Sequence, residues 1–512
     1  MTAIDTEAGR IHGGTTLTKR ADVQAYLGIP FAAPPVGELR FRPPAPVEPW
    51  DGVRETKRFA PAAPQNPDPM MVASGYYVPP TSEQDCLNLN VWTPRNDDRR
   101  RPVLVWIHGG AYVTGSNSSG YNNGAELAAT LDVVVVSINY RLGILGFLHL
   151  GHVLGEDYRD SANLAILDQL AALRWVRDNI LKFGGDPDNV TVFGESAGGA
   201  AVGTLLGTPA SQGLFRRAII QSGTAERARD EAESSAVTSA VLAEAGLTEA
   251  TASELIGMPI ERLLEVQQRI SDQWAQKVIG LPLPFQPMWG GDVLPEFPLE
   301  AVRHGVNSDV DLLVGTNLNE GSFFTELRPE STGDQRSARE RTEVAIAEDF
   351  GDTIDYTTYA RTVAEVLGVE PVDNQVLESY LSDRLYRQPT NRLLDARAQA
   401  RGRNYAYLFT WPSPLMDGRL GSCHALDVPF VFRQLHRIEA VSLVGENPPE
   451  QLSDWMSVAW TRFAREGVPE SAGLPVWPRY EQSTRETMIL DLQPRIESDP
   501  RAPLRHLWSE TR

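Results

Sequence analysis

The stretch TVFGESAGG (residues 191–199) decides the fold of this 512-residue chain. Its first residues continue an apolar strand that starts at Val190, and its last residues are the small ones of a helix start. A serine between two glycines, in the pattern G-x-S-x-G, fits a turn so tight that only small residues lie beside it. Such a turn lifts the serine hydroxyl above the edge of a sheet. The stretch therefore predicts a strand, a sharp turn and a helix, with Ser196 as a nucleophile.

The segments around this turn predict a mostly parallel sheet. Residues 102–107 and 133–138 are apolar runs without alternation, as expected of strands buried on both faces. Apolar residues recur at helical spacing over 161–183, between these strands and the serine turn. Alternating strands and helices imply an α/β fold with helices on both faces of the sheet. The first hundred residues instead resemble a twisted β region with proline-rich loops.

Two charged helical stretches, about 225–276 and 331–403, carry no sign of a buried strand. We interpret both as helical insertions that cover the active site, so residues 1–512 are expected to form one catalytic domain. Strand-like segments return at 311–315 and 405–409.

The charge of the chain bears on its partners. With 47 basic and 67 acidic residues the formal net charge is −20. Phosphates would be repelled, which excludes nucleic acid as a partner. The same charge favours neutral or cationic substrates over anionic ones. We expect a solvated acidic surface on a soluble monomer whose partner is a small-molecule substrate.

The sequence also predicts a cytoplasmic location. Residues 1–20 contain Asp5 and Glu7 where a signal peptide would be apolar, and no apolar run approaches the length of a membrane helix. Two cysteines, Cys86 and Cys423, are too few for a disulfide framework and suggest a reducing compartment. We expect neither a metal nor a cofactor.

A second motif, WIHGGAY at 106–112, directly follows a buried strand. Acyl transfer places negative charge on the former carbonyl oxygen, so N–H donors must point to where that charge appears. In an α/β-hydrolase fold, a loop of this type and the residue after the serine supply those donors. This assigns Gly109, Gly110 and Ala197 to an oxyanion hole; the alternative for the two glycines is an ordinary turn.

The base must be one of eight histidines. The chain order serine, acid, histidine leaves His304, His424, His436 and His506. We prefer His424 because it lies in a loop of small residues, 421–427, after the last of the predicted strands. His304 comes before Glu320, the acid favoured below, and His436 and His506 lie in charged helical contexts.

The acid should follow a buried strand between the serine and the histidine. The strand at 311–315 leads through a polar turn to Glu320. Spacing alone does not separate Glu320 from Asp292 and Glu326. Such an acid would fix the tautomer of the histidine and stabilise its charged form.

Further motifs run almost end to end through the chain: GIPFA (28–32), EQDCLNLNV (83–91), NYR (139–141), FGGDP (183–187), QSG (221–223), NEG (319–321) and HA (424–425). Together with the serine turn, they resemble the type-B carboxylesterase and cholinesterase family, in particular its bacterial p-nitrobenzyl-esterase-like members.

The resemblance implies an α/β-hydrolase fold and a serine esterase that hydrolyses carboxylic esters of small to medium size through an acyl-enzyme. It favours Glu320 over Asp292 as the acid, which gives a triad of Ser196, Glu320 and His424. It also implies that Ser222, in the QSG segment, lies beside the triad and hydrogen-bonds there.

The chain departs from the family pattern in two places. Secreted relatives pair the cysteine at the position of Cys86 with another, but Ala63 occupies the partner position here, which agrees with a reducing compartment. Cys423 is then expected to be a packing residue. The segment 66–81, which would form the mouth of the site, lacks the tryptophan that cholinesterases use to hold a quaternary ammonium. A choline-ester specialist is therefore not expected.

Two other functions remain open. The same triad would serve a carbamate or amide hydrolase, and some members of the superfamily are non-catalytic binding proteins, although these lose triad residues. The sequence does not specify the substrate. Aromatic residues are candidates for the pocket walls, and each is equally compatible with core packing: Tyr112, Phe285, Trp289, Phe323 and Phe324.

Overall fold

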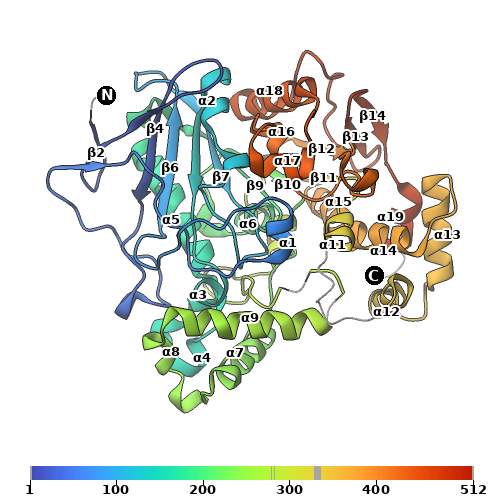
Figure 1. The fold of residues 1–512 in the computed structure, drawn as a ribbon, viewed down its shortest axis with the longest axis horizontal. Helices are drawn as coiled ribbons and strands as arrows, with labels where there is room; N and C mark the ends of the chain where they lie inside the picture. The colour runs from blue at the N-terminus through green and yellow to red at the C-terminus, as the bar shows by residue number, and fades with distance from the viewer. Residues whose placement is uncertain (1–2, 278, 282, 328–335, 510–512) are drawn as a thin grey trace.

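A computed structural model describes residues 3–277, 279–281, 283–327 and 336–509. Its centre is an eleven-stranded sheet in the order β14-β13-β12-β11-β10-β9-β7-β8-β6-β4-β3 (Figure 1). Its strands are β3 (Gly14–Thr16), β4 (Val23–Pro30), β6 (Asn88–Thr93), β7 (Arg101–Ile107), β8 (Val134–Ile138), β9 (Gly185–Glu195), β10 (Arg217–Gln221), β11 (Asp311–Asn317), β12 (Asn404–Phe409), β13 (Glu486–Leu490) and β14 (Arg495–Ser498).

The middle of this sheet is parallel, from β8 through β7, β9, β10, β11 and β12 to β13. Antiparallel pairs occur only toward its two edges. The predicted mostly parallel sheet is thus confirmed. A separate small sheet joins β1 (Ile4–Asp5), β2 (Arg10–His12) and β5 (Val53–Glu55), within the β region expected for the first hundred residues.

Strand β7 explains why the central strands are apolar without alternation. Every residue of β7 is buried. Val103 and Val105 belong to the core on one face, with α5 (Leu164–Asn179) and α6 (Ala197–Leu206). Leu104 and Trp106 belong to the core on the other face, with α2 (Ala125–Leu131) and α18 (Glu450–Glu466). Helices therefore cover both faces, and both must be apolar.

The strand order reverses at β7. The chain forms β8 on one side of β7 and then crosses to form β9 on the other side. In open α/β sheets, ligands bind at the carboxyl ends of the strands where the order reverses in this way. The loops after β7 and β9 are therefore the expected floor of a site.

Both predicted insertions are helical. The first contains α7 (Glu231–Ala245), α8 (Glu254–Gly257) and α9 (Ile260–Lys277), which gather at one end of the molecule in Figure 1. The second contains α12 (Ala338–Phe350), α13 (Tyr356–Leu367), α14 (Asp373–Ser382), the π-helical turn η8 (Asp383–Arg387) and α15 (Gln388–Ala396). The start of the second prediction, residues 331–335, lies outside the described residues.

Shorter helices complete the fold: α1 (Pro69–Ala73), α3 (Gly143–Phe147), α4 (Gly151–Leu154), α10 (Pro298–Arg303), α11 (Ser322–Glu326), α16 (Val428–Val431), α17 (Ile438–Val444) and α19 (Ala502–Ser509). Among the helices of the described residues, none has both the length and the apolar character needed to cross a membrane.

A buried ion pair anchors the loop that follows β8. Asp168 on α5 accepts hydrogen bonds from the backbone N–H, Nε and Nη2 of Arg141, at 3.0, 2.8 and 2.6 Å. Next to it, Tyr140 stacks on His108 with ring centroids 4.5 Å apart, and its hydroxyl donates to the His108 carbonyl at 2.7 Å. Because Tyr140 is next to Arg141 in the chain, the ion pair also holds Tyr140 in place against His108, in the loop after β7.

Replacing Asp168 with alanine should lower the free energy of unfolding by about 3–5 kcal/mol, because Arg141 would remain buried without its counter-charge. Urea unfolding followed by circular dichroism measures the change. The matched control is Asp178→Ala, which removes a surface partner of Arg177 from the same helix. Its free energy of unfolding should be close to that of the unmodified protein. Equal stability of the two variants would contradict the anchoring role.

Candidate active site

The carboxyl edge of the sheet brings the predicted site residues together. Because parallel strands end at the same edge, the residues that follow them become neighbours in space. Five neighbouring strands contribute in this way: Gly109 follows β7, Ser196 follows β9, Ser222 follows β10, Glu320 follows β11 and His424 follows β12.

The turn at Ser196 is as sharp as its sequence predicted. Ser196 has φ 57° and ψ −124°, and α6 begins at the next residue. A Cβ on Gly194 would lie 2.5 Å from the carbonyl carbon of Gly198, and a Cβ on Gly198 would lie 2.0 Å from the Ile107 carbonyl oxygen. Both glycines are therefore required for β7, β9 and α6 to approach one another. The amide of Ala197 is in the first turn of α6, where N–H groups have no partner within the helix.

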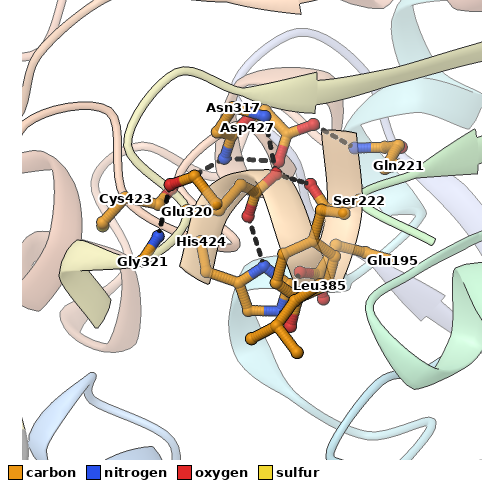
Figure 2. Close-up of polar contacts among 12 residues, drawn as sticks. Glu195, Gln221, Ser222, Asn317, Glu320, Gly321, Leu385, Cys423, His424 and Asp427 are labelled. Carbon is orange, nitrogen blue, oxygen red and sulfur yellow. Dashed lines mark hydrogen bonds and ion pairs between the residues drawn. The ribbon is translucent and has the colours of Figure 1, made fainter. Parts of the chain in front are cut away.

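A buried carboxylate is the centre of the site (Figure 2). Glu320 accepts a hydrogen bond at its Oε1 from the Ser222 hydroxyl at 2.5 Å and from the Asn317 N–H at 2.6 Å. Its Oε2 lies 2.6 Å from Nδ1 of His424. Glu320 is fully buried, and its two oxygens have partners from the end of β11 and from the loops after β10 and β12. The contact between Ser222 and the acid, which the family resemblance implied, is present.

The other acids and histidines that the sequence offered lie elsewhere. Two cavities, described below, adjoin Ser196, and none of these residues lines either of them. Each forms its own ion pair: Asp292 with Arg159, Glu326 with Arg419, His304 with Glu296, and His436 with Glu450. His506 contacts Arg505. Among the candidates, only Glu320 and His424 are brought to the serine turn.

The loop after β7 is pressed against Ser196. Gly110 has φ 111°, and its carbonyl accepts from the amides of Val113 and Thr114 at 3.0 and 2.9 Å. A Cβ on Gly109 would lie 2.8 Å from the Glu195 carbonyl oxygen and 3.0 Å from Cβ of Ser196. Within the described residues, the amides of Gly109 and Gly110 have no hydrogen-bond acceptor. These donors are therefore free to bind an oxyanion beside the serine.

A cavity opens beside Ser196 and His424. Its walls include Phe323 and Phe324, whose rings lie 5.7 and 5.8 Å from that of His424. Other lining residues come from the segment expected to form the mouth, from the loop before α2 and from the segment after α9: Asp68, Met70, Met71, Ser74, Tyr121 and Leu281. Two of the aromatic candidates are thus wall residues.

A smaller cavity meets the first one at Ser196. Tyr112, Ala197 and Ser222 line it. Phe285 and Trp289 line neither cavity, which corrects their assignment as pocket walls. Phe285 is fully buried in the core, and Trp289 packs against Phe297 with ring centroids 6.2 Å apart.

Glu195, next to the nucleophile, is the first site residue that the sequence analysis missed. Its Oε1 lies 3.1 Å from Nε2 of His424, and no hydrogen bond joins Nε2 to Ser196 among the described residues. Burial raises the pKa of Glu195, and the nearby His424 opposes that rise. Burial lowers the pKa of His424, but Glu195 and then Glu320 raise it, and the net shift is upward. Glu195 is the residue before the serine in the G-x-S-x-G motif, but the motif assigns no function to that position.

Tyr386 is the second missed residue. It lies on the π-helical turn η8, a rare geometry that often marks functional sites. Its ring stacks on His424 with centroids 4.5 Å apart, and its hydroxyl lies 3.4 Å from Nε2. It lines both cavities. No sequence pattern predicts a π-turn here, so no signal was available.

A second buried carboxylate, that of Asp427, lies in the loop that contains His424 and holds it in place. Asp427 accepts hydrogen bonds from the side chains of Gln221 at 2.9 Å and Tyr407 at 3.0 Å. Asn317 donates from its side chain to the Cys423 carbonyl at 2.7 Å. Burial raises the pKa of Asp427, and the bond from Gln221 opposes the rise. This network fixes the backbone on both sides of His424.

The two cysteines are both buried and free. Burial raises the pKa of each thiol. Cys423 is fully buried beside the histidine, as expected of a packing residue. Within the described residues, no cluster of three or more His, Cys, Asp or Glu side chains is arranged to hold a metal ion.

Comparisons with known proteins agree with this geometry. The model of the carboxylesterase family matches residues 1–508. The chain is 36% identical over 507 residues to the para-nitrobenzyl esterase of Bacillus subtilis, covering 98% of this chain and 97% of that protein. It is 34% identical to the phenmedipham hydrolase of Pseudarthrobacter oxydans, covering 91% of each.

Among solved structures, a carboxylesterase of Geobacillus stearothermophilus superimposes with a TM-score of 0.86 at 37% identity, covering 99% of this chain and 100% of that chain. Its match and that of the family model extend over nearly the whole sequence. The chain therefore belongs to the carboxylesterase family, with an α/β-hydrolase fold and the ester-bond hydrolase activity of that family.

Proposed function

We propose that this protein hydrolyses carboxylic esters of small to medium size through an acyl-enzyme on Ser196. The observation that carries the proposal is the hydrogen-bonded series Ser222, Glu320, His424, which ends in the cavity beside Ser196. This arrangement supplies a base with a fixed tautomer next to a hydroxyl that lines the cavity. Catalytic hydrogen bonds are often long or absent before substrate binds, so the missing bond between Ser196 and His424 does not oppose this role.

The proposed reaction has two steps. In the first, His424 takes the proton of Ser196 as its Oγ attacks the ester carbonyl, the bond to the alcohol oxygen breaks, and His424 gives the proton to the departing alcohol. In the second, His424 takes a proton from water as its oxygen attacks the acyl-enzyme, the bond between the acyl carbon and Oγ breaks, and His424 returns the proton to Ser196, which releases the acid. The amides of Gly109, Gly110 and Ala197 hold the negative oxygen in both steps.

We further propose a monomer in the cytoplasm, built as the single domain 1–512. The two free, buried cysteines support a reducing compartment. The net charge of −20 supports a solvated surface without self-association. Size-exclusion chromatography with light scattering tests the oligomeric state.

Replacing Ser196 with alanine should abolish ester hydrolysis, with a loss of about 10⁴-fold or more in kcat, because no other group would form the acyl-enzyme. The measurement is hydrolysis of p-nitrophenyl esters from acetate to long acyl chains. The control is Ser253→Ala, an exposed serine at the start of α8. Substantial activity of Ser196→Ala would reject Ser196 as the nucleophile.

Replacing Gly109 with alanine should lower kcat by about 10²–10³-fold, since the new Cβ would displace an oxyanion donor from Ser196. Gly257→Ala is the matched control, because a Cβ at Gly257 meets nothing within 4 Å. Thermal unfolding of both variants separates a local change from loss of the fold. Unchanged kcat in Gly109→Ala would argue against this loop as the oxyanion hole.

Replacing Glu195 with glutamine should move the acidic limb of the kcat/KM profile to lower pH. His424 must be neutral to accept the serine proton, so activity rises with pH as His424 loses its own proton. The Glu195 carboxylate raises the pKa of His424, and glutamine removes that effect. The measurement is kcat/KM against pH for both proteins. An unmoved limb, or one moved to higher pH, would contradict the coupling of these two groups.

A further inference from the structure

The two cavities beside Ser196 differ in access to the base. His424 lines the larger cavity but not the smaller one. Under the proposed mechanism, on which this inference rests, His424 gives its proton to the departing alcohol. The alcohol therefore occupies the larger cavity. The acyl group, on the other side of the carbonyl carbon, extends into the smaller cavity.

Arg227 is the charged residue among those described that line the smaller cavity. It lies in the segment between β10 and α7 and shares this cavity with Ser196, Ala197 and Tyr386. Its Nη2 donates one hydrogen bond, to the Leu385 carbonyl at 3.1 Å. Within the described residues, no carboxylate lies within ion-pair distance of Arg227. The remaining guanidinium donors are thus available to a ligand.

The neighbouring acid, Glu226, raises the pKa of Arg227 through its charge but forms no hydrogen bond with it. Glu226 is bound at both oxygens by Nε and Nη2 of Arg392, each at 2.5 Å. Burial lowers the pKa of Arg227, which reflects the loss of water around its charge. A partly buried guanidinium without a hydrogen-bonded carboxylate is under-compensated, and a planar carboxylate is the group that best compensates it.

Arginines with a structural role in this protein have more partners. Arg141 binds both oxygens of Asp168 and the Arg42 carbonyl. Arg392 binds Glu226 in the same two-point manner. Compared with these, Arg227 is under-coordinated and faces a cavity that adjoins the nucleophile.

We propose that Arg227 binds a carboxylate at the far end of the acyl group. The preferred substrates are then half-esters of short dicarboxylic acids, in which one carboxyl is esterified and the other is free. The free carboxylate pairs with Arg227 while the ester carbonyl lies at Ser196. Arg227 is a specificity residue and takes no part in bond making or breaking.

The charges that line the larger cavity determine which part of the substrate can carry the carboxylate. Asp68 and Glu195 line that cavity, so a carboxylate on the alcohol part would meet acidic side chains. The net charge of the chain favoured neutral or cationic substrates, but the local charge of the smaller cavity has the opposite sign. The anion is therefore accepted on the acyl side and not on the alcohol side.

The test compares kcat/KM for three esters: benzyl hydrogen glutarate, neutral benzyl pentanoate, and the pentanoate ester of 4-(hydroxymethyl)benzoate, which carries its carboxylate on the alcohol. We expect the unmodified protein to prefer the glutarate half-ester to benzyl pentanoate by about tenfold or more, as one charged hydrogen-bonded contact provides. The alcohol-side carboxylate should give the lowest value of the three.

Variants assign the preference to Arg227. In Arg227→Gln the ratio of half-ester to neutral ester should fall by about tenfold or more, and Arg227→Lys should retain part of it. The matched control is Arg384→Gln, which removes a nearby cation that lines neither cavity and pairs with Asp349. Its ratio should remain that of the unmodified protein.

The outcomes distinguish this inference from the proposed function. Hydrolysis of benzyl pentanoate with no preference for the half-ester would overturn the role of Arg227 and leave the esterase proposal intact. The same holds if Arg227→Gln and Arg384→Gln change the ratio equally. No hydrolysis of any ester by the unmodified protein would overturn the proposed function together with the inference. If Arg227→Gln does not fold, the ratio of half-ester to neutral ester is compared between Arg227→Lys and the unmodified protein. An unchanged ratio in Arg227→Lys would then overturn the role of Arg227.

Discussion

The hydrogen bond between Glu320 and His424, 2.6 Å long, joins the loops that follow β11 and β12. The same carboxylate holds Ser222 at the end of β10, so one buried charge connects three strands of the sheet. Buried charges persist in proteins only when their oxygens have partners. Glu320 therefore needs the surrounding loops in place as much as they need Glu320, and the position of His424 over the cavity follows from this mutual requirement.

The serine side of the site is set by packing instead. Gly194 and Gly198 let β9 and α6 approach so closely that the backbone of Ser196 adopts a left-handed conformation. Strain of this kind persists where the surrounding structure over-determines it. The fully buried β7, the stacking of Tyr140 on His108 and the buried pair of Arg141 with Asp168 provide that support. A charge network thus positions the base, and steric closeness positions the nucleophile.

The local parts of this architecture were predictable from sequence. The turn at Ser196, the apolar strands and the glycine loop depend on neighbouring residues, and their patterns predicted them correctly. The choice of Glu320 over Asp292 needed the family resemblance, because spacing does not reveal which acid meets the histidine. Phe285 was wrong as a wall residue because an aromatic side chain fits a core equally well. Tyr386 and Arg227 reach the site only through long-range packing and a π-helical turn, which no short pattern encodes.

The placement of His424 in only one of the two cavities also sets the order of events under the proposed mechanism. The water that cleaves the acyl-enzyme must be activated by His424, so it occupies the place that the alcohol has left. The alcohol is then the first product and the acid the last, as in ping-pong kinetics. Any other hydroxyl compound that enters the vacated place competes with water for the acyl group, and the apolar walls around Phe323 and Phe324 favour such acceptors. Hydrolysis and transesterification are therefore alternative fates of one intermediate.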